Sequence, residues 1–317
     1  MEKILEINNL NVGFNIEEQF FEALHGVTFH LEKGRSLGLV GESGCGKSIT
    51  ASSIMQLLPS NALVKSGEIL YKNENILNYS NKQMQQLRGS KIVLIPQDPM
   101  TSLNPLYTIG EQVVEAIEYH TDLTKKEAKQ LAIDTLKAVK LPEAEKRYND
   151  YPHQFSGGMR QRVIIAMALS CKPELIIADE PTTALDVTVQ AQILDLIKEI
   201  QKNYGTSLIL ITHDLGVVAE TCNEVAVMYA GRIVEYADTI SLFENPKHPY
   251  TQGLIESLPD TKEKKLLTIE GQPPSIYETI SGCPFYPRCS KKMEICTTAF
   301  PKTTQISESH TVNCYLY

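Results

Sequence analysis

The sequence predicts an α/β fold built around a mainly parallel β-sheet. Four short apolar runs have the length and composition of buried strands, at residues 36–40, 92–95, 175–178 and 208–211. Segments with apolar residues at helical spacing, such as residues 187–200, lie between them. Because parallel strands are usually joined by helical crossovers, this alternation favours a parallel sheet.

The sheet is expected to belong to a first domain at residues 1–250. Smaller elements are expected around the sheet in the same domain. A helical insert is expected at about residues 98–172. Thr124 and Glu127 form a capping box there, because their side chains can satisfy exposed backbone N–H groups at a helix start. Residues 224–238 predict a β-hairpin. Further short strands are expected at residues 4–10, 27–31 and 68–71.

Composition narrows the classes of function. Hydrophobic residues make up 42% and charged residues 21%, which is typical of a soluble globular protein. The net charge of −8 and the absence of a Lys- or Arg-rich run argue against a nucleic-acid partner. No run approaches the ~18 apolar residues of a membrane span, and the first residues do not resemble a signal peptide. We therefore expect a cytoplasmic protein that works at a membrane only through partners.

A glycine-rich run directly after the strand at residues 36–40 matches the phosphate-loop pattern G-x-x-x-x-G-K-[ST]. Its glycines let backbone N–H groups surround a phosphate, and the following helix start adds its positive dipole end. Lys47 can reach the β- and γ-phosphates of a nucleotide, and Ser48 can bind Mg²⁺. A chance turn is the alternative, but the strand before and the helix after favour ATP binding. The run consists of Gly41, Glu42, Ser43, Gly44, Cys45, Gly46, Lys47 and Ser48.

Two carboxylates follow the apolar strand at residues 175–178. The strand would carry Asp179 to the carboxyl edge of the sheet, where phosphate loops also lie. Asp179 could hold Mg²⁺ directly or through water, and Glu180 could act as the general base on the attacking water. A solvated acidic turn would explain the pair equally well if the phosphate loop were absent.

Ser156, Gly157 and Gly158 precede a further helical pattern. A Ser N-cap followed by glycines exposes several N–H donors at the positive end of a helix, which can bind an anion. Taken alone, this stretch is explained more simply as an ordinary helix cap.

The order of these motifs resembles that of ATP-binding-cassette (ABC) proteins over roughly the first 250 residues. The stretch SGG-x-x-Q just before the acidic strand distinguishes this family from other phosphate-loop proteins. The resemblance implies a P-loop NTPase core with a mixed, mainly parallel sheet, an antiparallel β subdomain, an inserted helical subdomain and a small Cys-containing C-terminal extension. The matching residues are residues 41–48, Gln97, residues 156–161, Asp179, Glu180, residues 184–186 and His213.

The resemblance implies a head-to-tail dimer in which each ATP touches both subunits. The signature residues Ser156, Gly157, Gly158 and Gln161 would bind the nucleotide held by the partner subunit's phosphate loop. Asp186 would lie at the dimer interface.

The resemblance also assigns roles within one subunit. Gln97 would sense Mg²⁺, which Ser48 and Asp179 would also bind, and His213 would contact the γ-phosphate. Phe14 is expected to stack on adenine, with Phe20 or Phe21 as competitors.

Residues 95–105, with the sequence IPQDPMTSLNP, resemble the Gln loop of the oligopeptide and dipeptide importer ATPases. Pro96 stands where an aromatic residue is common, but Gln97 is in place. Residues 246–251 and 282–289 resemble the C-terminal extension of that subfamily. The resemblance implies a peripheral protein at the cytoplasmic face of the cell membrane. Its partners would be two transmembrane permease subunits, a sister ATPase or a second copy, and indirectly an extracytoplasmic solute-binding protein.

Other functions are compatible with part of the pattern. ATPases of the same subfamily import nickel, glutathione or other small solutes. A soluble ABC protein acting on ribosomes or DNA would usually have two cassettes or a long coiled-coil insertion, whereas this chain has one phosphate loop. A regulatory nucleotide binder would be expected to lack the base, and Glu180 is present.

Pro, Cys and polar residues increase from about residue 245, so residues 251–317 are expected to form a small appended domain. Its cysteines have the spacing C-x5-C-x6-C-x17-C, without the C-x-x-C of common zinc ribbons. The resemblance implies a 4Fe–4S cluster on them, with zinc or free thiols as alternatives. The four cysteines are Cys283, Cys289, Cys296 and Cys314.

Overall fold

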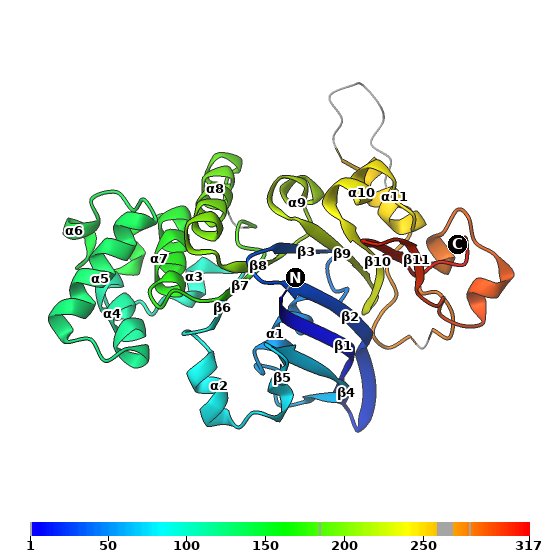
Figure 1. The fold of residues 1–317 in the computed structure, drawn as a ribbon, viewed down its shortest axis with the longest axis horizontal. Coiled ribbons are helices and arrows are strands. Elements are labelled where there is room, and N and C mark those ends of the chain that lie inside the picture. The colour runs from blue at the N-terminus through cyan, green and yellow to red at the C-terminus, as the bar shows by residue number, and fades with distance from the viewer. Residues whose placement is uncertain (1, 184, 259–268, 279) are drawn as a thin grey trace. The chain divides into compact units, whose positions relative to one another are not determined.

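The chain forms two compact units in the computed structural model, which describes residues 2–183, 185–258, 269–278 and 280–317 (Figure 1). The first unit comprises Met1–Asn78 and Leu210–Tyr317, and the second comprises Tyr79–Ile209. The C-terminal segment therefore folds with the N-terminal strands. The expected division into residues 1–250 and 251–317 stays a prediction.

An antiparallel sheet in the first unit confirms the expected antiparallel subdomain. Its strand order is β2-β1-β4-β5. Ile7 lies opposite Phe29 on one side and Ile69 on the other, and all three are buried. Alternating apolar residues thus form one buried face. The strands are β1 (Lys3–Ile16), β2 (Gln19–Glu32), β4 (Ala62–Tyr71) and β5 (Glu74–Asn75).

The second sheet of this unit combines a parallel pair with antiparallel strands. Strand β3 (Ser36–Val40) is buried along its whole length and pairs in parallel with β9 (Glu224–Tyr229). β10 (Arg232–Asp238) completes the expected hairpin with β9. The C-terminal strands β11 (Thr304–Ser307) and β12 (His310–Val312) continue the sheet beyond β10.

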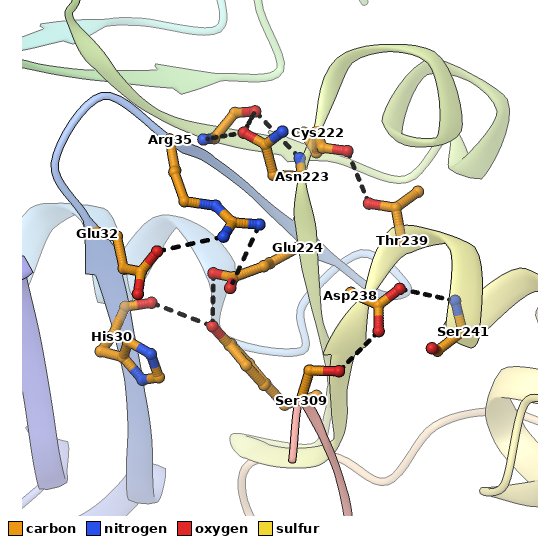
Figure 2. A network of polar contacts seen from close by, with 12 residues as sticks. His30, Glu32, Arg35, Cys222, Asn223, Glu224, Asp238, Thr239, Ser241 and Ser309 are labelled. Atoms are coloured by element: carbon orange, nitrogen blue, oxygen red, sulfur yellow. Dashed lines mark hydrogen bonds and ion pairs between the residues drawn. The ribbon is translucent and has the colours of Figure 1, made fainter. Parts of the chain in front are cut away.

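Polar side chains join the starts of β3 and β9 (Figure 2). The backbone N–H and the hydroxyl of Ser36 both donate to the side-chain oxygen of Asn223, each at 2.9 Å. Arg35 forms ion pairs with Glu32 at 3.2 Å and with Glu224 at 3.8 Å. These contacts anchor the start of the strand whose other end leads into the phosphate loop. The helices of this unit are α1 (Lys47–Ile54), α9 (Leu215–Thr221), α10 (Thr239–Glu244) and α11 (Pro249–Glu256), with the 3-10 turns η1 (Ile76–Asn78), η3 (Tyr286–Arg288) and η4 (Glu294–Thr297).

The second unit contains the expected helical insert. Strand β6 (Ile92–Ile95) pairs in parallel with β7 (Leu175–Asp179), and β8 (Ser207–Thr212) runs across the boundary between the units. The capping box predicted at Thr124 and Glu127 is confirmed. The helices are α2 (Asn81–Leu87), α3 (Pro99–Ser102), α4 (Ile109–His120), α5 (Lys125–Ala138), α6 (Ala144–Arg147), α7 (Gly157–Leu169) and α8 (Val187–Tyr204), with the 3-10 turn η2 (Pro152–Gln154). Among the described residues, no helix has both the length and the apolar character needed to cross a membrane.

Candidate functional site

The phosphate loop lies between β3 and α1 in the first unit. Gly46 is the N-cap of α1 and has a φ of 109°, a conformation that favours glycine. A Cβ atom at Gly46 would also lie 2.6 Å from Cδ2 of Leu24, so packing and backbone both require glycine. A Cβ atom at Gly44 would meet no described atom within 4 Å, so the loop is open at this residue.

Lys47 folds back over this loop and is only 5% exposed. Its ammonium group donates hydrogen bonds to the backbone oxygens of Gly41 at 2.7 Å and Glu42 at 3.1 Å. Because this buried ammonium group contacts neutral carbonyls, it is well suited to bind an anion. Burial raises the pKa of the Cys45 thiol, which agrees with a small packing residue inside the loop.

Glu42 has a partner that the sequence analysis did not identify. Its carboxylate accepts two hydrogen bonds from Arg288, at 2.6 and 2.9 Å, and its backbone N–H donates to the hydroxyl of Tyr250 at 2.9 Å. Both partners come from the C-terminal segment of the same unit. No local motif points to Arg288, because it lies 246 residues from Glu42 in the chain.

The acidic pair lies at the carboxyl end of β7 in the second unit. Asp179 is the last residue of the strand, and Glu180 follows with a φ of 45°. The carboxylate of Glu180 accepts a hydrogen bond from the side-chain amide of Gln97 at 3.0 Å and another from the Thr183 hydroxyl at 2.8 Å. Gln97 comes shortly after β6, and parallel strands end at the same edge of a sheet. The structure thus brings Gln97 and Glu180 together.

The signature residues begin α7 in the same unit. Ser156 is the N-cap, and its hydroxyl accepts a hydrogen bond from the backbone N–H of Met159 at 3.4 Å. A Cβ atom at Gly158 would lie 2.4 Å from Cγ1 of Val189, so α7 and the first turn of α8 approach closely only with glycine there. The Gln161 side chain is fully buried, and neither its oxygen nor its nitrogen has a hydrogen-bond partner in the described part of the chain.

The remaining predicted residues lie at the ends of elements. Asp186 caps α8 by accepting a hydrogen bond from the N–H of Val189 at 3.0 Å. His213 is exposed directly after β8. Ala184, part of the motif that resembles the family, lies outside the described residues.

A cavity of about 460 Å³ opens beside the phosphate loop in the first unit. Gly44 and Ile49 line it, together with the aromatic side chains of Phe20 and Phe21. Phe14 is half-buried on β1 opposite Phe21, and it is not among the described residues that line this cavity. The choice of Phe14 as the adenine partner stays a prediction.

The four C-terminal cysteines line one small cavity in the first unit. Cys283 and Cys296 are buried, the other two are half-buried, and all four are free thiols. Burial, with a smaller contribution from the neighbouring thiols, raises the pKa of Cys283 to about 11. The four thiols therefore converge in space, which their spacing in the sequence does not show.

No set of three or more His, Cys, Asp or Glu side chains in the described parts of the chain is arranged to hold a single metal ion. The four cysteines are therefore not in the arrangement of a single-ion site.

Comparison with known proteins identifies the family. Residues 24–183 match the ABC transporter family, and residues 234–296 match the C-terminal region of oligopeptide/dipeptide transporters. The dipeptide transport ATP-binding protein DppD of Bacillus subtilis (strain 168) is 50% identical, over 100% of this chain and 95% of its own length. The oligopeptide transport ATP-binding protein OppD of Haemophilus influenzae is 48% identical, over 100% of this chain and 98% of its own.

Solved structures agree with this fold. The ATP-binding cassette MJ0796, in a dimeric post-hydrolysis state bound to ADP and Pi, has a TM-score of 0.67 and 27% identity, covering 74% of this chain and 98% of its own. CbiO1 of Clostridium perfringens, part of the ABC transporter complex cbiONQ, has a TM-score of 0.67 and 29% identity, covering 77% of this chain and 92% of its own. The phosphate loop, the acidic strand end and these matches lead to one conclusion: the chain belongs to the ABC transporter family, as an ATPase subunit of the oligopeptide and dipeptide transporter group.

Proposed function

We propose that this chain hydrolyses ATP to energise the uptake of oligopeptides or dipeptides through partner permeases. The observation that carries the proposal is the pair of family matches along one chain. The match at residues 24–183 supports the motor function, and the match at residues 234–296 supports peptide as the transported solute. Half of all positions are shared with a dipeptide transport protein over the full length.

Roles at the nucleotide follow from the order of the motifs in the family. Lys47 binds the β- and γ-phosphates, while Ser48, Gln97 and Asp179 hold Mg²⁺. Glu180 is the general base, and its contact with Gln97 supports this role because the amide orients the carboxylate. His213 contacts the γ-phosphate. Phe14 stacks on adenine, with Phe20 and Phe21 as the competing aromatics.

ATP is sandwiched between two subunits in a head-to-tail dimer. A γ-phosphate needs hydrogen-bond donors on more than one side, and the exposed start of α7 in a partner subunit can supply them. Ser156, Gly157 and Gly158 form that contact, and Asp186 lies at the interface. Gln161 belongs to the same signature, but its side chain is fully buried within its own subunit. Solved dimers of a related cassette support this arrangement.

The partners follow from the transporter family. Two transmembrane permease subunits bind this chain at the cytoplasmic face of the membrane. A sister ATPase or a second copy completes the dimer, and an extracytoplasmic binding protein delivers the solute. Residues 1–250 form the cassette domain, and residues 251–317 form the C-terminal extension.

The four cysteines hold a 4Fe–4S cluster. The cavity that all four of these free thiols line supports this proposal. Such a cluster would join four points of the C-terminal segment and could exchange one electron. The ligands are Cys283, Cys289, Cys296 and Cys314.

ATPase activity of the purified chain tests the motor proposal. Glu180→Gln should abolish turnover yet retain ATP, so that size-exclusion chromatography detects an ATP-bound dimer. Glu199→Gln is the control, because this exposed carboxylate forms a surface ion pair with Lys140. If Glu180→Gln hydrolyses ATP normally, the assignment of the base is wrong. Peptide-dependent stimulation of ATPase activity in vesicles with the permeases and binding protein tests the solute.

A further inference from the structure

Arg288 forms a two-pronged ion pair with Glu42 of the phosphate loop. Nη1 lies 2.6 Å from Oε2 and Nη2 lies 2.9 Å from Oε1. The Arg288 side chain is only 5% exposed and that of Glu42 is 27% exposed. Paired hydrogen bonds of this kind are directional, and burial reduces the screening that weakens surface ion pairs. The contact therefore fixes the position of Glu42.

Arg288 is held in place by its own surroundings. Nε donates to the backbone oxygen of Glu270 at 2.9 Å, and Nη2 donates to that of Ile269 at 3.3 Å. Nη1 also donates to the hydroxyl of Tyr229 at 3.3 Å. The guanidinium lies 5.9 Å from the ring centre of Phe285. These contacts give the guanidinium one orientation, which points its paired N–H groups at Glu42.

Glu42 is in turn connected to the phosphate-binding lysine. Its backbone oxygen accepts a hydrogen bond from Lys47 at 3.1 Å. Its carboxylate is thus attached to the loop that is proposed to bind the triphosphate. Without a cation beside it, that carboxylate would repel a polyanion, because like charges at short range raise the free energy of binding. Arg288 cancels this charge.

The position of Arg288 depends on the four-cysteine segment. It ends the turn η3, between Cys283 and Cys289. The backbone N–H of Cys283 donates to the oxygen of Cys296 at 2.8 Å, and that of Arg288 donates to the oxygen of Phe285 at 3.0 Å. Arg288 therefore connects the phosphate loop to the segment that carries the cysteines.

We propose that Arg288 is a positioning residue for the phosphate loop, and that through it the four-cysteine segment sets the affinity for ATP. Arg288 acts through Glu42, by cancelling its charge and holding the loop backbone. The inference rests on the proposed function, because it requires residues 41–48 to bind ATP.

The role of the Arg288–Glu42 ion pair is tested by measuring equilibrium binding of a fluorescent ATP analogue to the full chain, with Mg²⁺ present. Arg288→Ala should weaken binding about tenfold, the usual order for a lost charge-assisted contact. The double variant with Arg288→Ala and Glu42→Gln should recover most of the lost affinity, because the unpaired carboxylate is removed. Arg288→Lys should bind ATP with an intermediate affinity, because lysine keeps the positive charge but cannot form the paired hydrogen bonds. Arg35→Ala is the control, because Arg35 pairs with Glu32 and Glu224 away from the loop (Figure 2).

Thermal unfolding of the same variants separates positioning from folding. If Arg288→Ala and Arg288→Lys bind like Arg35→Ala, the inference is overturned. It is also overturned if adding Glu42→Gln restores no affinity and the loss of affinity across the variants parallels their fall in melting temperature. Cys289→Ser alone should weaken ATP binding. Combined with Arg288→Ala it should weaken binding little further, because both changes act through the side chain of Arg288. Unchanged binding in Cys289→Ser would overturn the link to the cysteine segment.

Lys47→Ala separates this inference from the proposed function. If Lys47→Ala loses the nucleotide while the Arg288 variants keep it, only the inference fails. If Lys47→Ala binds normally, the proposed nucleotide site itself fails.

Discussion

The side-chain amide of Gln97 donates a hydrogen bond of 3.0 Å to the carboxylate of Glu180. The hydroxyl of Thr183 donates to the same carboxylate oxygen at 2.8 Å. These two donors orient the proposed base from residues that follow the paired strands β6 and β7. Both hydrogen bonds are accepted by Oε2 of Glu180, so together they orient the carboxylate.

Gln97→Ala should lower the turnover number for ATP by roughly tenfold to a hundredfold, because Glu180 loses the amide donor that orients it. Nucleotide affinity should change less than turnover. Gln130→Ala is the matched control, since this exposed amide donates a hydrogen bond to Asp134 on the surface of α5. Steady-state ATPase kinetics give both quantities, and wild-type turnover in Gln97→Ala would contradict the role.

Lys47→Ala should weaken ATP binding by roughly tenfold to a hundredfold, because a charge-assisted contact with phosphate is lost. Lys33→Ala is the control, because it removes a surface ammonium group that pairs with Glu2 at 3.2 Å. Isothermal titration with ATP and Mg²⁺ measures both variants. Equal affinities would refute the assignment of Lys47.

Ser156→Ala should lower turnover in the dimer and also cost about 1 kcal/mol of stability, because α7 loses its N-cap. Thr124→Ala removes an equivalent cap from α5, whose hydrogen bond has the same length of 3.4 Å. It should therefore lose similar stability and keep its activity. Urea unfolding and ATPase assays separate the two effects. Equal turnover in both variants would remove Ser156 from the partner's nucleotide site.

Anaerobically purified protein should contain about four iron atoms per chain, with acid-labile sulfide and visible absorption. Cys296→Ser should lose iron, because one of the four ligands is removed. Cys222→Ser is the control, because Cys222 is buried but does not line the cysteine cavity. Wild-type protein without iron and without visible absorption would exclude the cluster. Zinc in its place would support the alternative.

The sequence by itself determined the features that depend on short-range geometry. The phosphate loop, the capping box at Thr124 and the hairpin of β9 and β10 each occupy a short stretch of chain. Their torsion angles, hydrogen bonds and apolar spacing are set by neighbouring residues, so their patterns can be read directly. The family match follows from the order of these patterns.

Only the tertiary structure decided which distant side chains meet. Gln97 and Glu180 are 83 residues apart, and Arg288 and Glu42 are 246 residues apart. Such contacts depend on how whole strands and segments pack, and no local pattern encodes the partner. The same reason applies to the four cysteines, whose spacing matched no common metal motif and which share one cavity only because the C-terminal segment folds around them.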